Sequence, residues 1–138
     1  MTPDLQSCLL CDDVRQERNG KFILIGLFDA IGSQSFPLVY PRLFVVTRWC
    51  SGEGGFLQHT RILAPDQAAP VLEGADIAFQ LPGPEATATN VEIFVNKSFP
   101  TEGTHWVEIL LNNDLKLRFP LRVQRIVSAP GTPHPPPA

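Results

Sequence analysis

The segment Leu115-Lys-Leu-Arg-Phe-Pro-Leu-Arg-Val123 decides the fold class. Its odd-numbered positions are all apolar, and its even-numbered positions are Lys, Arg or Pro. Side chains of a β-strand alternate between the two faces of a sheet. A period of two is therefore typical of a strand with one face in a core and one in water. We predict that this segment is such a half-buried strand.

The preceding segment, His105 to Leu111, predicts a hairpin with this strand, joined by Asn112-Asn113-Asp114. A shift of one residue would mix apolar and polar side chains on each face, so the apolar pattern selects one register. Pro120 has no backbone N–H, which places its strand at a sheet edge there or breaks the ladder. A three-residue loop predicts these opposed pairs: Leu111 and Leu115, Ile109 and Leu117, Val107 and Phe119, His105 and Leu121, Glu108 and Arg118, and Trp106 and Pro120.

A second hairpin is predicted around Asn19-Gly20, because this dipeptide favours a two-residue type I′ turn. Its second strand, Phe22 to Phe28, is apolar on both faces, so we expect a central strand covered on both sides. The two-residue turn predicts these opposed pairs: Arg18 and Lys21, Gln16 and Ile23, Val14 and Ile25, and Asp12 and Leu27.

The remaining patterns predict an antiparallel, immunoglobulin-like β-sandwich of about seven or eight short strands. Residues 5–126 form one domain. The Pro-rich residues 127–138 are expected to be a disordered tail. Further strands are predicted at Arg42–Trp49, Phe56–Leu63, Ile77–Leu81 and Asn90–Lys97, with connections at Asp29–Pro41 and Ala64–Pro70.

Composition limits the function classes. The 138 residues carry 11 Lys and Arg against 14 Asp and Glu, a net charge of −3, which argues against a nucleic-acid partner. No apolar run approaches the roughly 20 residues that span a bilayer, and the N-terminus does not resemble a secretory signal. Three cysteines cannot all pair within one chain. We therefore expect reduced thiols and a cytoplasmic location.

For each candidate catalytic or metal-binding residue, a structural role is favoured over a chemical one. Cys8 and Cys11 have C-x-x-C spacing, but positions i and i+3 of a strand face opposite ways, which does not suit a metal knuckle. The adjacent carboxylates of Asp12 and Asp13 also point to opposite faces, and we expect them to anchor a loop. His105 should be a core histidine. We predict no catalytic residue, no metal site and no cofactor.

A possible partner surface comes from two segments. Lys116, Arg118 and Arg122 share a strand face that could bind phosphate, but we prefer a solvated edge because the net charge is negative. The connection at Asp29–Pro41 carries apolar residues that look out of place in a free loop. The predicted surface comprises Phe36, Val39, Tyr40, Trp106, Lys116, Arg118, Pro120 and Arg122.

Three segments resemble an uncharacterised bacterial domain-of-unknown-function family of small all-β proteins. They are residues Cys11–Asp29, Arg42–Trp49, and Phe99–Gly103 continuing to Phe119–Val123. The resemblance spans roughly Cys8 to Ile126 and implies a bacterial, intracellular, sandwich-like domain. It carries no known activity, so it transfers no functional residues.

The first functional hypothesis is a non-enzymatic module that binds another macromolecule, because no catalytic motif was found. The expected partner is another protein, or a second copy of the chain, held through the edge strand at Pro120. One alternative is a small metal-dependent or acid–base enzyme that uses Asp12 and Asp13, with His105. Another is a structural subunit of a homo-oligomeric or phage-like assembly.

Overall fold

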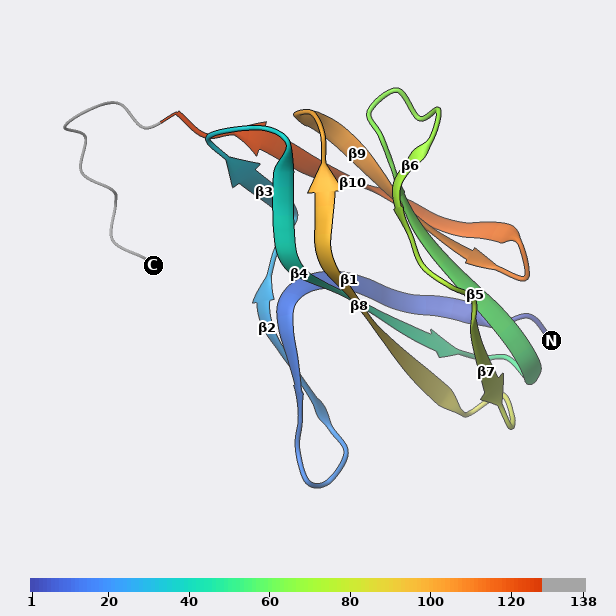
Figure 1. Ribbon diagram of the computed structural model, residues 1–138. Helices are drawn as coiled ribbons and strands as arrows, with labels where there is room; N and C mark the ends of the chain where they lie inside the picture. The colour runs from blue at the N-terminus through green and yellow to red at the C-terminus, as the bar shows by residue number, and fades with distance from the viewer. Residues whose placement is uncertain (128–138) are drawn as a thin grey trace.

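A computed structural model describes residues 1–127 as ten β-strands in two sheets that face one another (Figure 1). The all-β prediction is confirmed, with more strands than predicted. The part of the chain expected to be a disordered tail lies, from residue 128 on, outside the described residues.

The first sheet has four antiparallel strands in the order β2-β1-β4-β8. Strand β8 forms one edge of this sheet and β2 forms the other. The bounds are Asp4–Gln16 for β1, Phe22–Leu27 for β2, Leu38–Cys50 for β4 and Thr87–Phe99 for β8.

The second sheet has six strands and is curled and mixed. Its order is β3-β10-β9-β5-β6, and β7 also pairs with β5. Strand β3 runs parallel to β10, so the prediction of a wholly antiparallel arrangement is wrong at this edge. The bounds are Ala30–Ser33 for β3, Gly54–Leu63 for β5, Pro70–Glu73 for β6, Ile77–Leu81 for β7, Gly103–Leu111 for β9 and Asp114–Arg125 for β10.

Two four-residue strands were not predicted: β3 lies in the predicted connection Asp29–Pro41, and β6 begins at Pro70, the last residue of the predicted connection Ala64–Pro70. Both are short, and Gly, Ser or Pro residues within or beside them hide the strand pattern. Strand β3 pairs with β10, which is distant in the sequence, whereas β6 pairs with the preceding strand β5.

The core lies between the sheets and draws apolar side chains from both. Trp49 of β4 is fully buried, and its ring stacks on Phe79 of β7 with centroids 5.6 Å apart. A polar network joins the sheets inside this core. Gln58 of β5 is fully buried, and its Oε1 accepts hydrogen bonds from Thr47, Trp49 and Asn90.

The β9–β10 hairpin confirms the predicted register from Leu117 onward, including Glu108 opposite Arg118. Leu117 is half-buried and Arg118 is exposed, as the alternation requires. The turn itself differs from the prediction. Asn112 and Asn113 both have positive φ and form a two-residue loop, so the predicted pairing of Leu111 with Leu115 is wrong. An irregularity between Leu115 and Leu117 restores the register and leaves Leu115 51% exposed.

The β1–β2 hairpin corrects two predictions. Its loop is longer than two residues, because the Glu17 N–H donates to the Lys21 carbonyl, and this moves the register by one residue. Val14 is opposite Leu24, and the side chain of Asp12, rather than that of Asp13, approaches Gly26. Strand β2 is an exposed edge strand and not the covered central strand that its composition suggested.

Candidate partner-binding site

Part of the predicted surface forms one continuous feature on β9 and β10. Trp106 lies opposite Pro120, and the Arg118 guanidinium lies over the Trp106 ring, 4.6 Å from its centroid. Arg118 also donates a hydrogen bond to Gln67. Glu108 lies opposite Arg118 as predicted, but its ion pair is with a residue of β5. The Arg61 guanidinium lies 2.7 Å from the Glu108 carboxylate.

The other predicted residues lie elsewhere. Phe36 and Tyr40 are half-buried and pack against the core, which explains their apolar character. Val39 on β4 is 52% exposed and belongs to the other sheet. The structure therefore places the predicted residues on both sheets instead of on one surface, with Arg125 stacked on Phe36 as a link to β10.

One side of the two-sheet body is open. In the first sheet, the part of β1 from Asp4 to Leu9 pairs only with β4, because the Leu10 carbonyl already accepts from the Phe28 N–H and β2 pairs with β1 from Cys11 onward. In the second sheet, β10 from Asp114 to Leu121 pairs only with β9, because β3 begins to pair at Arg122. Each sheet thus ends, along this side, in a half-strand without a second neighbour among residues 1–127. We call this feature the open side.

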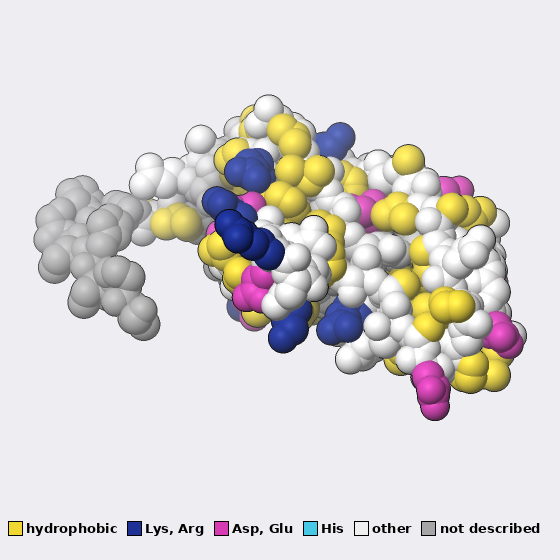
Figure 2. All heavy atoms as spheres, turned by 90° about the horizontal axis from the view of Figure 1, so that it is seen from below, with side chains coloured by type: hydrophobic (Ala, Val, Ile, Leu, Met, Phe, Trp, Pro, Cys, Tyr) yellow, Lys and Arg dark blue, Asp and Glu magenta, His cyan; other side chains and the backbone are white. Residues whose placement is uncertain are grey.

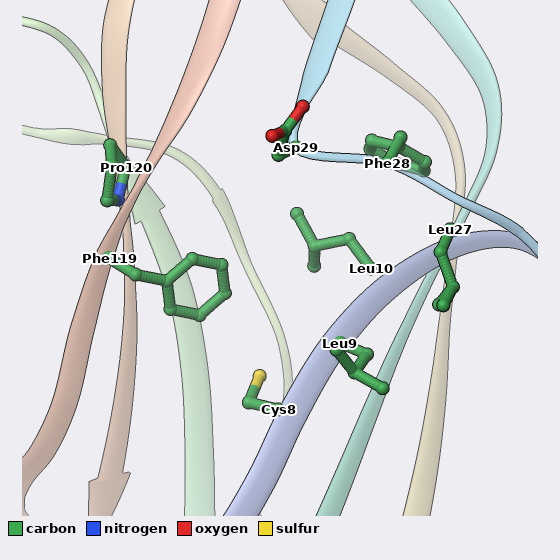
Figure 3. Close-up of a pocket in the computed structure, with 8 residues that line it drawn as sticks. All are labelled: Cys8, Leu9, Leu10, Leu27, Phe28, Asp29, Phe119 and Pro120. Atoms are coloured by element: carbon green, nitrogen blue, oxygen red, sulfur yellow. The ribbon is translucent and has the colours of Figure 1, made fainter.

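An apolar cleft of about 440 Å³ lies on the open side (Figure 3). Strand β1 lines it from the first sheet, β10 lines it from the second, and the crossing from β2 to β3 closes its end. Leu9 and Leu27 are 40% and 58% exposed at its rim. The lining residues are Cys8, Leu9, Leu10, Leu27, Phe28, Asp29, Phe119 and Pro120.

The cleft carries little charge. Burial, together with the nearby Glu92 carboxylate, raises the pKa of the Cys8 thiol to about 12, so this thiol is neutral and behaves as an apolar group. Asp29 is the one carboxylate among the lining residues, and it lies 3.9 Å from the Arg122 guanidinium. Such a surface is suited to binding apolar side chains.

The residues considered for acid–base chemistry are engaged in structural contacts. The Tyr40 hydroxyl donates to Asp12, and Asp13 forms ion pairs with Arg15 and Arg42 at 2.8 and 3.3 Å. These ion pairs, together with its other hydrogen bonds, lower the pKa of the Asp13 carboxyl. His105 is fully buried, as predicted, with Nδ1 3.1 Å from the Gly103 carbonyl oxygen.

Within residues 1–127, no group of three or more His, Cys, Asp or Glu side chains is arranged to hold a metal ion. Cys8 packs against the main core and Cys11 against an outer cluster, so the two thiols face opposite ways, as predicted. The same residues include no helix that is long and apolar enough to cross a membrane.

The two histidines of the second sheet are expected to titrate on opposite sides of pH 6.5. Burial lowers the pKa of His59, but hydrogen bonds to Glu73 and Asp76 raise it more, so its pKa lies above 6.5. Burial lowers the pKa of His105 below 6.5. The contribution of protonated His59 to the free energy of unfolding is therefore present below pH 6.5 and is lost as the pH rises through its folded pKa. Protonation of buried His105 lowers the free energy of unfolding as the pH falls below 6.5. An NMR titration of the imidazole C2–H signals checks both directions; a reversed order of the two midpoints contradicts them.

Of the two strand edges on the open side, the sequence predicted the one on β10 and not the one on β1. The absence of an N–H in Pro120 indicated the β10 edge. The free half of β1 has no local signal, because it depends on where β2 stops pairing.

This geometry defines an all-β, two-sheet domain whose distinguishing feature is an incomplete sheet edge on each side of one cleft. The chain belongs to DUF6941, described as a family of unknown function, whose model matches residues 6–124. This confirms the resemblance seen in the sequence. No curated protein matches the chain.

The chain is similar in structure to the Pseudomonas fluorescens alkylpurine DNA glycosylase AlkC bound to DNA containing an abasic site analog. The TM-score is 0.50 at 10% sequence identity. The match covers 88% of this chain and 30% of the glycosylase chain. At this identity the similarity concerns the fold alone.

Proposed function

We propose that this protein is a non-enzymatic binding module that accepts an extended segment of another protein at its open side. The observation that supports this most strongly is that two half-strands with one free edge each, Asp4–Leu9 and Asp114–Leu121, lie on either side of one apolar cleft. Unpaired backbone N–H and C=O groups at a sheet edge are templates for an added strand. Alternate side chains of that strand would enter the cleft and supply specificity.

The exposed apolar side chains at the rim support the same proposal. Leu9, Leu27 and Leu115 are each at least 40% exposed, and all three lie on or beside the open half-strands. Burying such side chains against a partner contributes about 25 cal/mol per Å² of apolar surface removed from water. The partner therefore gains both backbone hydrogen bonds and apolar contacts.

The proposal also includes the type of fold and the choice of a binding role over an enzymatic one. We propose an immunoglobulin-like sandwich, which the closing β9–β10 hairpin and the short β3 beside the last strand support. A binding role is preferred over an enzyme because the carboxylates of Asp12 and Asp13 are held by Tyr40, Arg15 and Arg42. A second copy of the chain could also supply the added strand, so self-association through the open side would use the same strand addition.

Two added charges at the rim of the cleft are expected to abolish partner capture. In Leu9→Lys/Leu27→Lys, two exposed apolar residues become ammonium groups that cannot be buried unpaired, so affinity falls about 100-fold or more. The measurement is affinity capture from a lysate of the source cells, followed by titration of the recovered partner. Val39→Lys/Leu57→Lys is the matched control, since it adds the same charges at exposed apolar positions outside the cleft.

The control variant should capture the partner as well as the native chain does. Equal loss in both variants would indicate a nonspecific charge effect. Undiminished capture by Leu9→Lys/Leu27→Lys would remove the open side as the binding site. Circular dichroism melting of each variant shows whether the fold is retained.

A further inference from the structure

A second groove lies on the other face of the first sheet, away from the open side. The β1–β2 hairpin projects from the two-sheet body at the bottom of Figure 1. Between this hairpin and the outer face of the sheet is a groove of about 560 Å³. We call it the hairpin groove, and it is lined by Asn19, Gly20, Lys21, Phe22, Leu24, Val46, Arg48 and Thr89.

The hairpin is held in this position by a small apolar cluster outside the main core. Cys11, Phe44 and Val46 are buried on the outer face, and Val14 and Leu24 of the hairpin pack against them. Gly26 has a φ of +71°, and a Cβ there would lie 2.6 Å from the Asp12 carboxylate. Only glycine readily combines this conformation with so close an approach. The groove is therefore a built feature with an apolar base.

The charged groups that line the groove are both cations. Asp13 pairs with Arg15 and Arg42 of the same face, which neutralises those two guanidinium groups in part. Lys21 and Arg48 line the groove itself, and neither forms an ion pair with a carboxylate of residues 1–127. Seen from the side of the hairpin, Lys and Arg side chains gather beside apolar ones (Figure 2).

We propose that the hairpin groove binds an extended acidic segment of a partner protein. Apolar side chains of that segment contact Phe22, Leu24 and Val46, and its carboxylates pair with Lys21 and Arg48. Charge complementarity supports this partner, because Lys21 and Arg48 border the apolar base of the groove and form no ion pair with any residue that the structure describes. This site is separate from the open side and does not depend on the function proposed there.

A protein segment fits the groove better than a nucleic acid does. A phosphate backbone carries a continuous row of negative charges and needs an extended row of free cations. Glu17 and Asp13 lie on the same hairpin as Lys21 and oppose such a row, and the chain as a whole has a net charge of −3. Alternating apolar and acidic side chains match the observed lining directly.

The test is a selection of random nine-residue peptides displayed on phage, against the full chain and against Lys21→Glu/Arg48→Glu. Peptides selected by the native chain should be enriched in Asp and Glu between apolar residues. Those selected by the double variant should be enriched in Lys and Arg. Native-selected peptides should lose about tenfold or more in affinity for the double variant, because two attractive charge pairs become repulsive ones.

Lys116→Glu/Arg122→Glu is the matched control, since it changes the net charge equally at exposed positions outside the groove. It should select the same acidic peptides as the native chain. If the native chain and both double variants selected peptides of the same average net charge, the proposal would be overturned. Backbone amide shifts on binding that avoid residues 19–24 and 46–48 would also overturn it, as would tighter binding of single-stranded DNA than of any selected peptide.

The groove variant Lys21→Glu/Arg48→Glu separates this proposal from the function proposed above. It should lose the acidic peptides while capturing the partner of the open side as the native chain does, because neither residue lines the cleft on the open side. Loss of partner capture together with the peptides would assign both ligands to one surface and contradict the hairpin groove as a separate site.

Discussion

Gln58→Leu is expected to lower the free energy of unfolding by about 4 kcal/mol or more, since each buried polar group left without a partner costs about 1–3 kcal/mol. The Gln58 Oε1 accepts hydrogen bonds from Thr47, Trp49 and Asn90 at 2.7, 2.8 and 2.9 Å. Its Nε2 donates to Thr60 and Glu92. Leucine fills similar space but leaves three donors without their acceptor.

Urea unfolding followed by circular dichroism measures this loss. Thr89→Val is a suitable control, because Thr89 is next to Asn90 on β8 but lies outside the network, and we expect a change within about 0.5 kcal/mol. If Gln58→Leu lowered the free energy of unfolding by less than about 1 kcal/mol, the stabilising role of the network would be contradicted, because a single hydrogen bond contributes about that much.

Trp49→Ala is expected to cost about 3–5 kcal/mol, the usual range for removing a large buried aromatic side chain. Trp49 is fully buried, stacks on Phe79, and donates its indole N–H to Gln58. The variant therefore creates a cavity between the sheets and removes one donor of the network.

Trp49→Phe separates these two causes. It keeps one aromatic ring in the core but removes the N–H and the five-membered ring of the indole, and Gln58 retains its other two donors, so the expected cost is about 1–3 kcal/mol. A comparison of the two variants by urea unfolding checks both values. Equal costs would show that the hydrogen bond, and not packing, dominates at this position.

The sequence predicted the last hairpin in detail because the strict alternation of Leu115–Val123 selects one register against His105–Leu111. Each pair from Leu117 with Ile109 to Leu121 with His105 is found as predicted. The prediction was wrong only at the turn, where Asn112 and Asn113 both adopt positive φ. Asparagine tolerates this conformation, so the sequence allowed either loop length.

The first hairpin was predicted less well because its apolar content is ambiguous. Strand β2 is apolar at nearly every position, and such a composition usually indicates burial on both faces. Here the strand is at an edge, and its side chains instead border the two clefts: Leu27 lines the open side and Phe22 lines the hairpin groove. Two of the exposed apolar residues that misled the fold prediction, Phe22 and Leu27, are therefore among those with proposed binding roles.

The candidate site was predicted only where a local signal exists. Pro120 marks the edge of β10 through its missing N–H, and it lines the cleft on the open side. The partner edge on β1 and the parallel strand β3 arise from contacts between distant segments, which one sequence does not encode locally.

Hydrogen exchange tests the strand-accepting open side most directly. Backbone amide exchange is measured for the chain alone and with the partner recovered by capture. Amides of Asp4–Leu9 and Asp114–Leu121 that lack a bond in the free chain should exchange more slowly in the complex, because an added strand bonds to them. Protection confined to β8 or to the outer face of the first sheet, with both open half-strands unchanged, would contradict the proposal.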